Sequence, residues 1–323
     1  MPRSERDFVA ARLKPNADTG QGDARSDFAG FATIAEAVRE ATEVLRTAGL
    51  DEPLLEARWL VASVAGLSSL DLLTKATASL GAARVERIEE CVRRRAAREP
   101  LSRILGIREF YGRDFELSGG TLDPRPDTEV LVEFVLRTLA QETTSGRRVN
   151  ILDIGTGTGA ILITLLAEYP RAEGLGIDVS GDAVATALKN AQVHDVAGRA
   201  QFQTRDIREG LGPEECFDFI VSNPPYIARG DIAGLEPEVR CHDPVAALEG
   251  GVDGLDFYRI FVGLVGRIRP QGWLVVEVGA GQAEDVIGVL LAAAPNAKLQ
   301  TANDLSGHTR VVAIQPQSTF MGE

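Results

Sequence analysis

Cysteine is scarce in this chain of 323 residues: three are present, Cys91, Cys216 and Cys241, and no two of them form a CxxC pair. This pattern argues against a disulfide framework and against a zinc site, and it suits the reducing cytoplasm. Long apolar runs are also missing. The longest stretch without a charged residue, 154–167, has 14 residues, fewer than the roughly 18 that a membrane-spanning helix needs. We therefore expect a cytoplasmic protein with no membrane association.

Basic residues are in the minority. Lys and Arg number 34 against 47 Asp and Glu, which gives a net charge of −13. A broad electrostatic grip on nucleic acid needs the opposite balance, so no direct nucleic-acid binding is expected. Histidine is rarer still, with three residues, and none of them forms a nucleophile–base or metal-ligand pattern with its sequence neighbours. No metal site is expected.

What is present is the composition of an ordinary globular protein, with 44% hydrophobic and 25% charged residues, at a length that suggests two domains. Residues 1–28 are charged and without an apolar stretch, and they indicate a flexible tail. Apolar residues at spacings of three and four predict a small helical domain over 29–99. Residues 100–122, with their glycine turns, predict a connecting β-hairpin. A larger domain is expected over 123–323.

The larger domain alternates strands and helices, which predicts an α/β fold with a mostly parallel sheet covered on both faces. The last two strands are separated by only 303–309, too short for a parallel crossover, so the last strand is expected to be antiparallel. The expected strands are 149–154, 174–179, 200–205, 217–222, 273–278, 298–302 and 310–315. The expected helices are 31–48, 53–65, 70–75, 84–98, 124–140, 160–168, 181–192, 255–267 and 282–293.

A glycine-rich segment follows the first strand of this domain and opens its helix: Gly155, Thr156, Gly157, Thr158 and Gly159. Glycines let the backbone turn sharply and let a ligand approach closely, and amides at a helix start can meet a polar group. The structural alternative is a tight turn that binds nothing.

An acid, Asp178, ends the next strand, 23 residues after Gly155, where it can accept hydrogen bonds from a ribose. These features fit a dinucleotide or S-adenosylmethionine equally well. The G-x-G-x-G spacing resembles class I methyltransferases, and Asp206-Ile207 resembles their adenine-contacting position. For Asp206 the alternative is an ordinary acid at a strand end.

The most specific motif is Asn223-Pro224-Pro225-Tyr226, directly after the fourth strand. A planar amide or base nitrogen is a poor nucleophile. The Asn223 side-chain oxygen and the Pro224 carbonyl are an acceptor pair that can hold its N–H groups and aim it at a methyl donor. The prolines stiffen the loop, and Tyr226 can wall the pocket or stack on a planar group. The alternative is a proline-rich turn that merely ends the strand.

From about Phe31 to Val312 the sequence resembles a known family, the bacterial release factor glutamine methyltransferases of the HemK type. At two positions where relatives commonly carry glutamate, this chain has Asp127 and Asp243, which keep the negative charge on a side chain that is one methylene shorter. The segments that carry the resemblance include Pro124-Arg125-Pro126-Asp127-Thr128-Glu129, the glycine motif, Ser222-Asn223-Pro224-Pro225-Tyr226-Ile227, Gly250-Gly251, Glu277-Val278-Gly279 and Asp304-Leu305 with Gly307 and Arg310.

The resemblance implies a seven-stranded class I methyltransferase sheet and a helical domain that binds the release factor. The implied reaction is N5-methylation of the glutamine in the factor's Gly-Gly-Gln motif, with S-adenosylmethionine as cofactor. The implied catalytic residues are Asn223 and Pro224, and the substrate-binding residues are Asn223, Pro224, Pro225 and Tyr226. The implied cofactor-binding residues are Gly155, Thr156, Gly157, Thr158, Gly159, Asp178, Asp206, Ile207 and Asn223.

Three other functions stay open on the sequence alone. A sister enzyme that methylates a glutamine of a ribosomal protein shares both motifs. An N6-adenine methyltransferase acting on nucleic acid also uses Asn-Pro-Pro-Tyr, although the charge of −13 speaks against it. A noncatalytic binding protein that kept the fold is the third.

Overall fold

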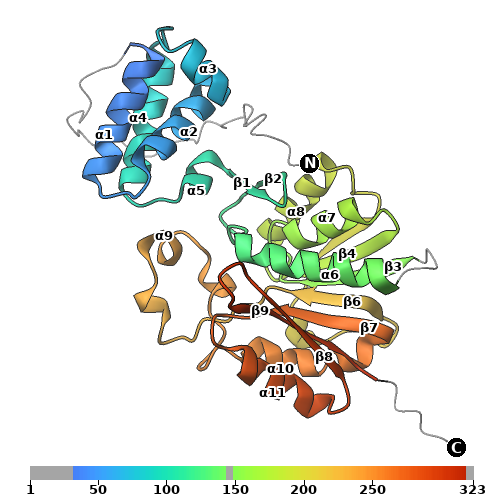
Figure 1. The fold of residues 1–323 in the computed structure, drawn as a ribbon. Coiled ribbons are helices and arrows are strands. Elements are labelled where there is room, and N and C mark those ends of the chain that lie inside the picture. The colour runs from blue at the N-terminus through green and yellow to red at the C-terminus, as the bar shows by residue number, and fades with distance from the viewer. Residues whose placement is uncertain (1–31, 143–147, 318–323) are drawn as a thin grey trace, which may run out of the picture. The chain divides into compact units, whose positions relative to one another are not determined.

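The computed structural model describes residues 32–142 and 148–317, and the expected tail, 1–28, lies outside the described residues. The chain divides into two compact units between Ile107 and Arg108. We call residues 32–107 the helical unit and the described residues from 108 to 317 the sheet unit. Figure 1 shows the elements of each unit.

The helical unit is a bundle whose core lies between α1, α2 and α4, as the sequence periodicity predicts. A capping box between Thr33 and Glu36 starts α1, because each side chain accepts a backbone N–H of the other residue. Arg95 of α4 and Glu56 of α2 form an ion pair at 2.6 Å across the bundle. The helices are α1 (Ile34–Thr47), α2 (Pro53–Ala65), α3 (Ser69–Thr74), α4 (Ala82–Ala96) and α5 (Leu101–Leu105).

The expectation of a hairpin over all of 100–122 is wrong in its first part, because the helix α5 occupies Leu101–Leu105. Ile104 and Leu105 are buried in the core of the helical unit, and Gly106 ends the helix in the left-handed conformation. The hairpin that follows consists of β1 (Ile107–Phe110) and β2 (Arg113–Glu116). The helix is stabilised by burial of these apolar side chains, and the local sequence pattern alone does not reveal that burial.

The sheet unit contains a seven-stranded sheet in the order β5-β4-β3-β6-β7-β9-β8, and it confirms the predicted fold class. The strands β3 to β7 pair in parallel, while β9 is antiparallel to both β7 and β8. The last strand is therefore antiparallel, as the short connection predicts. The strands are β3 (Val149–Ile154), β4 (Ala172–Asp178), β5 (Ala200–Thr204), β6 (Phe217–Ser222), β7 (Ile268–Glu277), β8 (Lys298–Asn303) and β9 (Thr309–Gln315).

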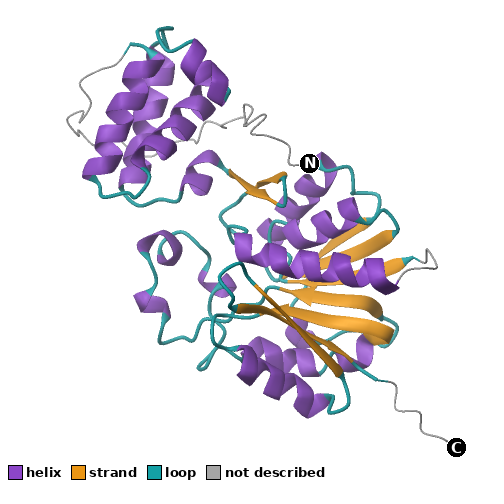
Figure 2. Ribbon diagram, in the orientation of Figure 1, coloured by secondary structure: helices purple, strands orange, loops and turns teal. Residues whose placement is uncertain are grey.

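Helices cover both faces of the sheet, and alternate strand residues point into two separate cores (Figure 2). On β3, Ile151 packs toward one face and Leu152 toward the other. One face is covered by α6 (Glu129–Glu142), α7 (Ala160–Glu168) and α8 (Gly181–Val193), and the other by α10 (Asp256–Val262) and α11 (Ala283–Ala293).

Two stretches differ from the expected elements. The helix expected over 255–267 ends at Val262, and a 3-10 turn, Val265–Arg267, leads into β7, which begins five residues earlier than expected. Between β6 and α10 the chain forms a long loop with α9 (Pro237–Arg240) and two 3-10 turns. This loop matters because it follows the Asn-Pro-Pro-Tyr motif directly.

The strand order also fixes where a ligand can bind. β3 lies between β4 and β6, so the connections after β3 and after β6 leave in opposite directions along the sheet. In open α/β sheets the crevice at such a switch point, outside the carboxyl ends of the strands, is the ligand-binding position. The Ser222 hydroxyl donates to the Ile154 carbonyl at 2.8 Å and ties the two strand ends together there.

Candidate active site

The glycine loop is a tight turn that is fastened to the neighbouring strand. The amides of Gly155 and Thr156 both donate to the Ile177 carbonyl, at 2.9 and 3.0 Å. Gly155 and Gly157 have φ of 70° and 55°, in the region that disfavours other residues. A Cβ at Gly155 would meet no atom within 4 Å, so the loop presents bare backbone to open space.

Asp153, at the end of β3, supports this loop from below. Its Oδ2 accepts the Thr156 hydroxyl at 2.7 Å, and the carboxylate is fully buried. Burial raises the pKa of the Asp153 carboxyl to about 7, while the hydrogen bond from Thr156 acts in the opposite direction and lowers this pKa. Asp153 therefore shapes the loop rather than facing a ligand.

The Asp178 carboxylate accepts hydrogen bonds from two backbone segments, the glycine loop and the start of the segment after β4. One carboxylate oxygen accepts the Gly157 amide and the other accepts the Ser180 amide, each at 2.9 Å. Burial raises the pKa of Asp178, and these amide hydrogen bonds oppose the shift. Each oxygen keeps a second lone pair, so the carboxylate remains able to accept from ligand hydroxyls.

Asp206 and Ile207 stand at the end of β5 with different environments. Asp206 caps the 3-10 turn Ile207–Glu209 by accepting the Arg208 amide at 2.9 Å, and it also pairs with the Arg208 guanidinium at 2.6 Å. These interactions lower the pKa of the Asp206 carboxyl. Ile207 is 4% exposed and forms part of the apolar core beneath.

The Asn-Pro-Pro-Tyr segment is held at both ends. The Asn223 Nδ2 group donates to the Thr128 hydroxyl at 3.0 Å. The Gln282 side chain donates to the Tyr226 carbonyl at 2.9 Å. The strand-like backbone after it is also fixed, because the Gly250 amide donates to the Ile227 carbonyl at 2.8 Å.

Two cavities meet at this segment. A larger one, of about 1000 Å³, is lined by Gly155, Gly157, Asp178, Asp206, Ile207, Asn223, Pro224 and Pro225 among others. A smaller one, of about 350 Å³, is lined by Asn223, Pro224 and Tyr226 together with residues of the long loop and of 122–127. Asn223 and Pro224 line both cavities, so a group in one can approach a group in the other there. Thr156, Thr158 and Gly159 line neither cavity.

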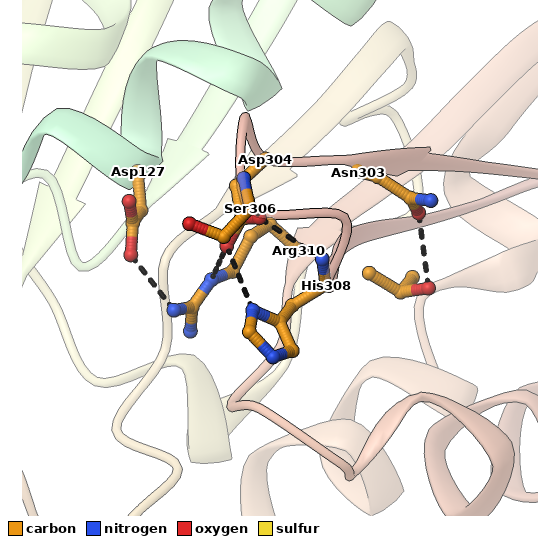
Figure 3. A network of polar contacts seen from close by, with 7 residues as sticks. Asp127, Asn303, Asp304, Ser306, His308 and Arg310 are labelled. Carbon is orange, nitrogen blue, oxygen red and sulfur yellow. Dashed lines mark hydrogen bonds and ion pairs between the residues drawn. The ribbon is translucent and has the colours of Figure 1, made fainter.

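Ion pairs shape one side of the smaller cavity. Arg310 of β9 bridges Asp127 and Asp304, at 2.9 Å to each carboxylate, and Figure 3 shows its guanidinium between the two acids. Arg125 pairs with the buried Asp243 at 2.6 Å. Asp127 and Asp243, the two aspartates at positions where relatives commonly carry glutamate, therefore each form an ion pair with an arginine that lines the smaller cavity.

Two residues outside the glycine and Asn-Pro-Pro-Tyr motifs, Glu277 and Arg310, also line the smaller cavity. Glu277 ends β7, is 1% exposed and lines this cavity, and Arg310 reaches it from β9. The signal in the sequence was an acid at the end of the apolar run 273–277, since a carboxylate is rarely fully buried unless it is paired.

The geometry agrees with the comparisons to known proteins. The protein-family model described as "PrmC N-terminal domain" matches residues 36–106 of the sequence. The family model described as "Methyltransferase small domain" matches residues 127–234. The release factor glutamine methyltransferase of Agrobacterium fabrum is 42% identical over 287 residues, which covers 88% of this chain and 98% of that protein. The chain belongs to the release factor glutamine methyltransferase family. The relative from Rhodospirillum rubrum is 47% identical and covers 82% and 80% of the two chains.

Among solved structures, the hMettl16 catalytic domain in complex with a 3′UTR hairpin shares the methyltransferase fold at a TM-score of 0.50. It is 17% identical, covering 73% of this chain and 82% of that chain. Within residues 32–142 and 148–317, no helix is long and apolar enough to cross a membrane. The same residues contain no group of His, Cys, Asp or Glu that could hold a metal ion.

Proposed function

We propose that this enzyme transfers a methyl group from S-adenosylmethionine to the side-chain amide nitrogen of the glutamine in the Gly-Gly-Gln motif of peptide chain release factors. The proposal sets this reaction in the cytoplasm, with the release factor as the protein partner. The observation that carries it is the meeting of the two cavities at Asn223 and Pro224. A donor in the larger cavity and a glutamine side chain in the smaller one would face each other at that junction.

The residues of the larger cavity suit the cofactor. Backbone without side chains at Gly155 and Gly157, the Asp178 carboxylate and the apolar Ile207 side chain supply contacts for a polar tail, a ribose and an adenine ring. When bound, S-adenosylmethionine supplies a sulfonium methyl group, whose bond to sulfur breaks as the bond to the amide nitrogen forms. The protein's part is to hold the two reactants in line, which in favourable systems contributes about 7–11 kcal/mol.

In the proposal, Asn223 and Pro224 hold the substrate amide, which is the group that receives the methyl. With its Nδ2 turned to Thr128, the Asn223 carboxamide has its Oδ1 left to accept an N–H of the substrate amide. The Pro224 carbonyl is the second acceptor of the pair. Tyr226, whose phenol has a pKa raised to about 12 by burial, stays neutral and walls the cavity. The amide nitrogen loses one proton during or after methyl transfer.

The deciding experiment is methyl transfer from radiolabelled S-adenosylmethionine to a purified release factor, followed by peptide mapping. Label on the glutamine of the Gly-Gly-Gln peptide is the expected result. Parallel arms contain ribosomal proteins, DNA and RNA. Label in one of these arms and none in the release factor would overturn the proposal. Binding of the cofactor without transfer to any arm would favour a noncatalytic protein.

Asp178→Ala is expected to weaken cofactor binding by about tenfold to a hundredfold, since a hydrogen bond to a charged group contributes about 1.5–3 kcal/mol. Calorimetric titration should use S-adenosylhomocysteine and its 2′-deoxy and 3′-deoxy forms. The unsubstituted protein should prefer the intact ribose, and the variant should lose that preference. A variant that still discriminates against both deoxy ligands would remove Asp178 from the ribose site, whatever its overall affinity.

The helical unit is proposed to bind the body of the release factor. Leu70 and Leu73 of α3 are exposed by 68% and 69% and offer apolar surface to a partner. Because burying one leucine side chain contributes about 1.5–3 kcal/mol, Leu70→Ser with Leu73→Ser should raise the KM for whole factor by at least about a hundredfold. Turnover of a short Gly-Gly-Gln peptide should not change. Equal effects on both substrates, or on neither, would contradict this role.

A further inference from the structure

The substrate of the proposed reaction offers the enzyme little besides its backbone. In a Gly-Gly-Gln segment two of the three residues have no side chain, so the groups next to the reacting glutamine are peptide N–H and C=O groups. Asn223 and Pro224 supply acceptors to the smaller cavity, for the N–H groups of the substrate amide. A peptide carbonyl needs a donor instead. That donor must line the same cavity and have an N–H or O–H group that no acceptor of the protein occupies.

Arg310 meets both conditions. It lines the smaller cavity, and its Nε group donates to the Asp304 carboxylate at 2.9 Å, while Nη2 lies 2.9 Å from the Asp127 carboxylate. Within residues 32–142 and 148–317 the third nitrogen, Nη1, has no such partner, and Figure 3 shows contacts from the other two nitrogens alone. Nη1 does not belong to the buried atoms that lack a partner, so a ligand can reach it. It carries two N–H donors.

The guanidinium of Arg310 is held in one position. Its own backbone carbonyl accepts the Val278 amide at 2.8 Å, which fixes β9 to the end of β7. Asp304 is fixed as well, because one of its carboxylate oxygens accepts the amides of Ser306 and His308, each at 2.9 Å. A planar guanidinium that two acids already orient loses little further freedom when a ligand binds. Nη1 is therefore a preorganised donor.

The charges around this donor favour a neutral acceptor. Arg125 and Arg310 both line the cavity. Arg125 pairs with Asp243, and Arg310 pairs with Asp127 and Asp304, so two positive charges meet three negative ones. A phosphate or carboxylate would face a wall with a net negative charge. A peptide carbonyl carries no net charge and still accepts from a guanidinium. The wall thus suits a polypeptide backbone better than the phosphates of a nucleic acid.

We propose that Arg310 is a substrate-binding residue whose Nη1 group donates to a backbone carbonyl of the Gly-Gly-Gln segment. The proposal rests on the proposed amide methylation. The contact holds the backbone beside the glutamine while Asn223 and Pro224 hold its side-chain amide. Glycines leave their carbonyl groups uncovered, so a donor in a fixed position can reach one of them.

The test measures kcat/KM for methylation of a short Gly-Gly-Gln peptide at saturating S-adenosylmethionine. Three analogues each replace one peptide group, after the first glycine, the second glycine or the glutamine, with a trans-alkene that has no carbonyl. Ester analogues at the same positions are the controls, since they lose the N–H and keep the carbonyl. One alkene analogue should react about ten- to hundredfold more slowly than the intact peptide, the value of a hydrogen bond to a charged group. Its ester counterpart should lose much less.

Arg310→Lys assigns that loss to Nη1. The change keeps a positive charge beside the buried Asp304 and removes the third nitrogen. The variant should react with the intact peptide about ten- to hundredfold more slowly, discriminate no longer against the alkene analogue, and bind cofactor normally. Arg269→Ala is the matched control, because Arg269 also pairs with a buried acid, Asp218, at 3.0 Å and lines neither cavity. This control should keep the discrimination even if its melting temperature falls.

Two results would overturn the proposal. One is an Arg310→Lys enzyme that discriminates against the alkene analogue as strongly as the unsubstituted enzyme. The other is an unsubstituted enzyme that methylates all three alkene analogues as fast as the intact peptide, a result that does not depend on the folding of any variant. Failure of the proposed function is a separate outcome, since the unsubstituted enzyme would then leave both the intact peptide and the whole release factor unlabelled.

Discussion

Replacement of Asn223 by alanine should lower the single-turnover rate of glutamine methylation by about 10² to 10³. The change removes the side-chain acceptor and leaves Pro224, Pro225 and Tyr226 in the loop. Loss of one preorganised hydrogen-bond partner costs this much in an oxyanion hole, where the partner likewise acts on a group held in one position. Most of the loss should fall on the rate rather than on KM, because many other contacts bind the release factor.

Two further measurements separate this role from a structural one. Cofactor affinity should stay within a few-fold of normal, because the glycine loop and Asp178 are unchanged. The melting curve should move little, since in the described structure the Asn223 side chain hydrogen-bonds one side chain, that of Thr128. Asn303→Ala is the control, as this exposed amide on β8 contacts Thr309 and lines neither cavity. A variant at position 223 with a near-normal rate would falsify the acceptor role and leave the segment as a structural turn.

Much of the fold was predictable because the signals are local and repeated. Short strand segments of five or six residues, most of them followed by a helix, predicted the order of elements in the sheet unit. The shortness of 303–309 gave the antiparallel last strand, which the structure confirms. The helix α5 was not predictable in the same way, since its five residues are helical through burial of Ile104 and Leu105 in a core formed by other segments.

The same limit applies to the site. Gly155 and Asn223 each follow a strand directly and Asp178 ends one, so their place at one edge of the sheet follows from the parallel order. Thr128 and Glu277 come from a 3-10 turn and a strand end 149 residues apart, and no spacing in the sequence links them. The contact of Thr128 with Asn223 and the place of Glu277 in the wall of the smaller cavity are visible only when the side chains are in place.

Gly250→Ala should reduce methylation about a hundredfold or more, although it replaces no residue that contacts a ligand in the proposal. A Cβ at this position would lie 2.6 Å from the Pro225 carbonyl oxygen, 2.9 Å from the Tyr226 Cα and 3.0 Å from the Gly254 Cα. All three are backbone atoms, so no side chain can rotate away. The Asn-Pro-Pro-Tyr backbone must shift instead, and a displacement of about 1 Å in a reacting group can cost about 10² in rate.

The expected pattern of the Gly250 variant is a catalytic defect with a moderate loss of stability. Overpacking of this kind costs about 1–3 kcal/mol, so the melting temperature should fall while the protein still folds at a low assay temperature. Cofactor titration should give near-normal affinity, because the glycine loop lies on other strands. Gly230→Ala is the matched control: a Cβ there meets no atom within 4 Å, and its φ is not in the left-handed region. Should the Gly250 variant methylate as fast as the Gly230 variant, the close backbone packing would not be what positions Asn223 and Pro224, and their placement would have to come from Thr128 and Gln282 alone.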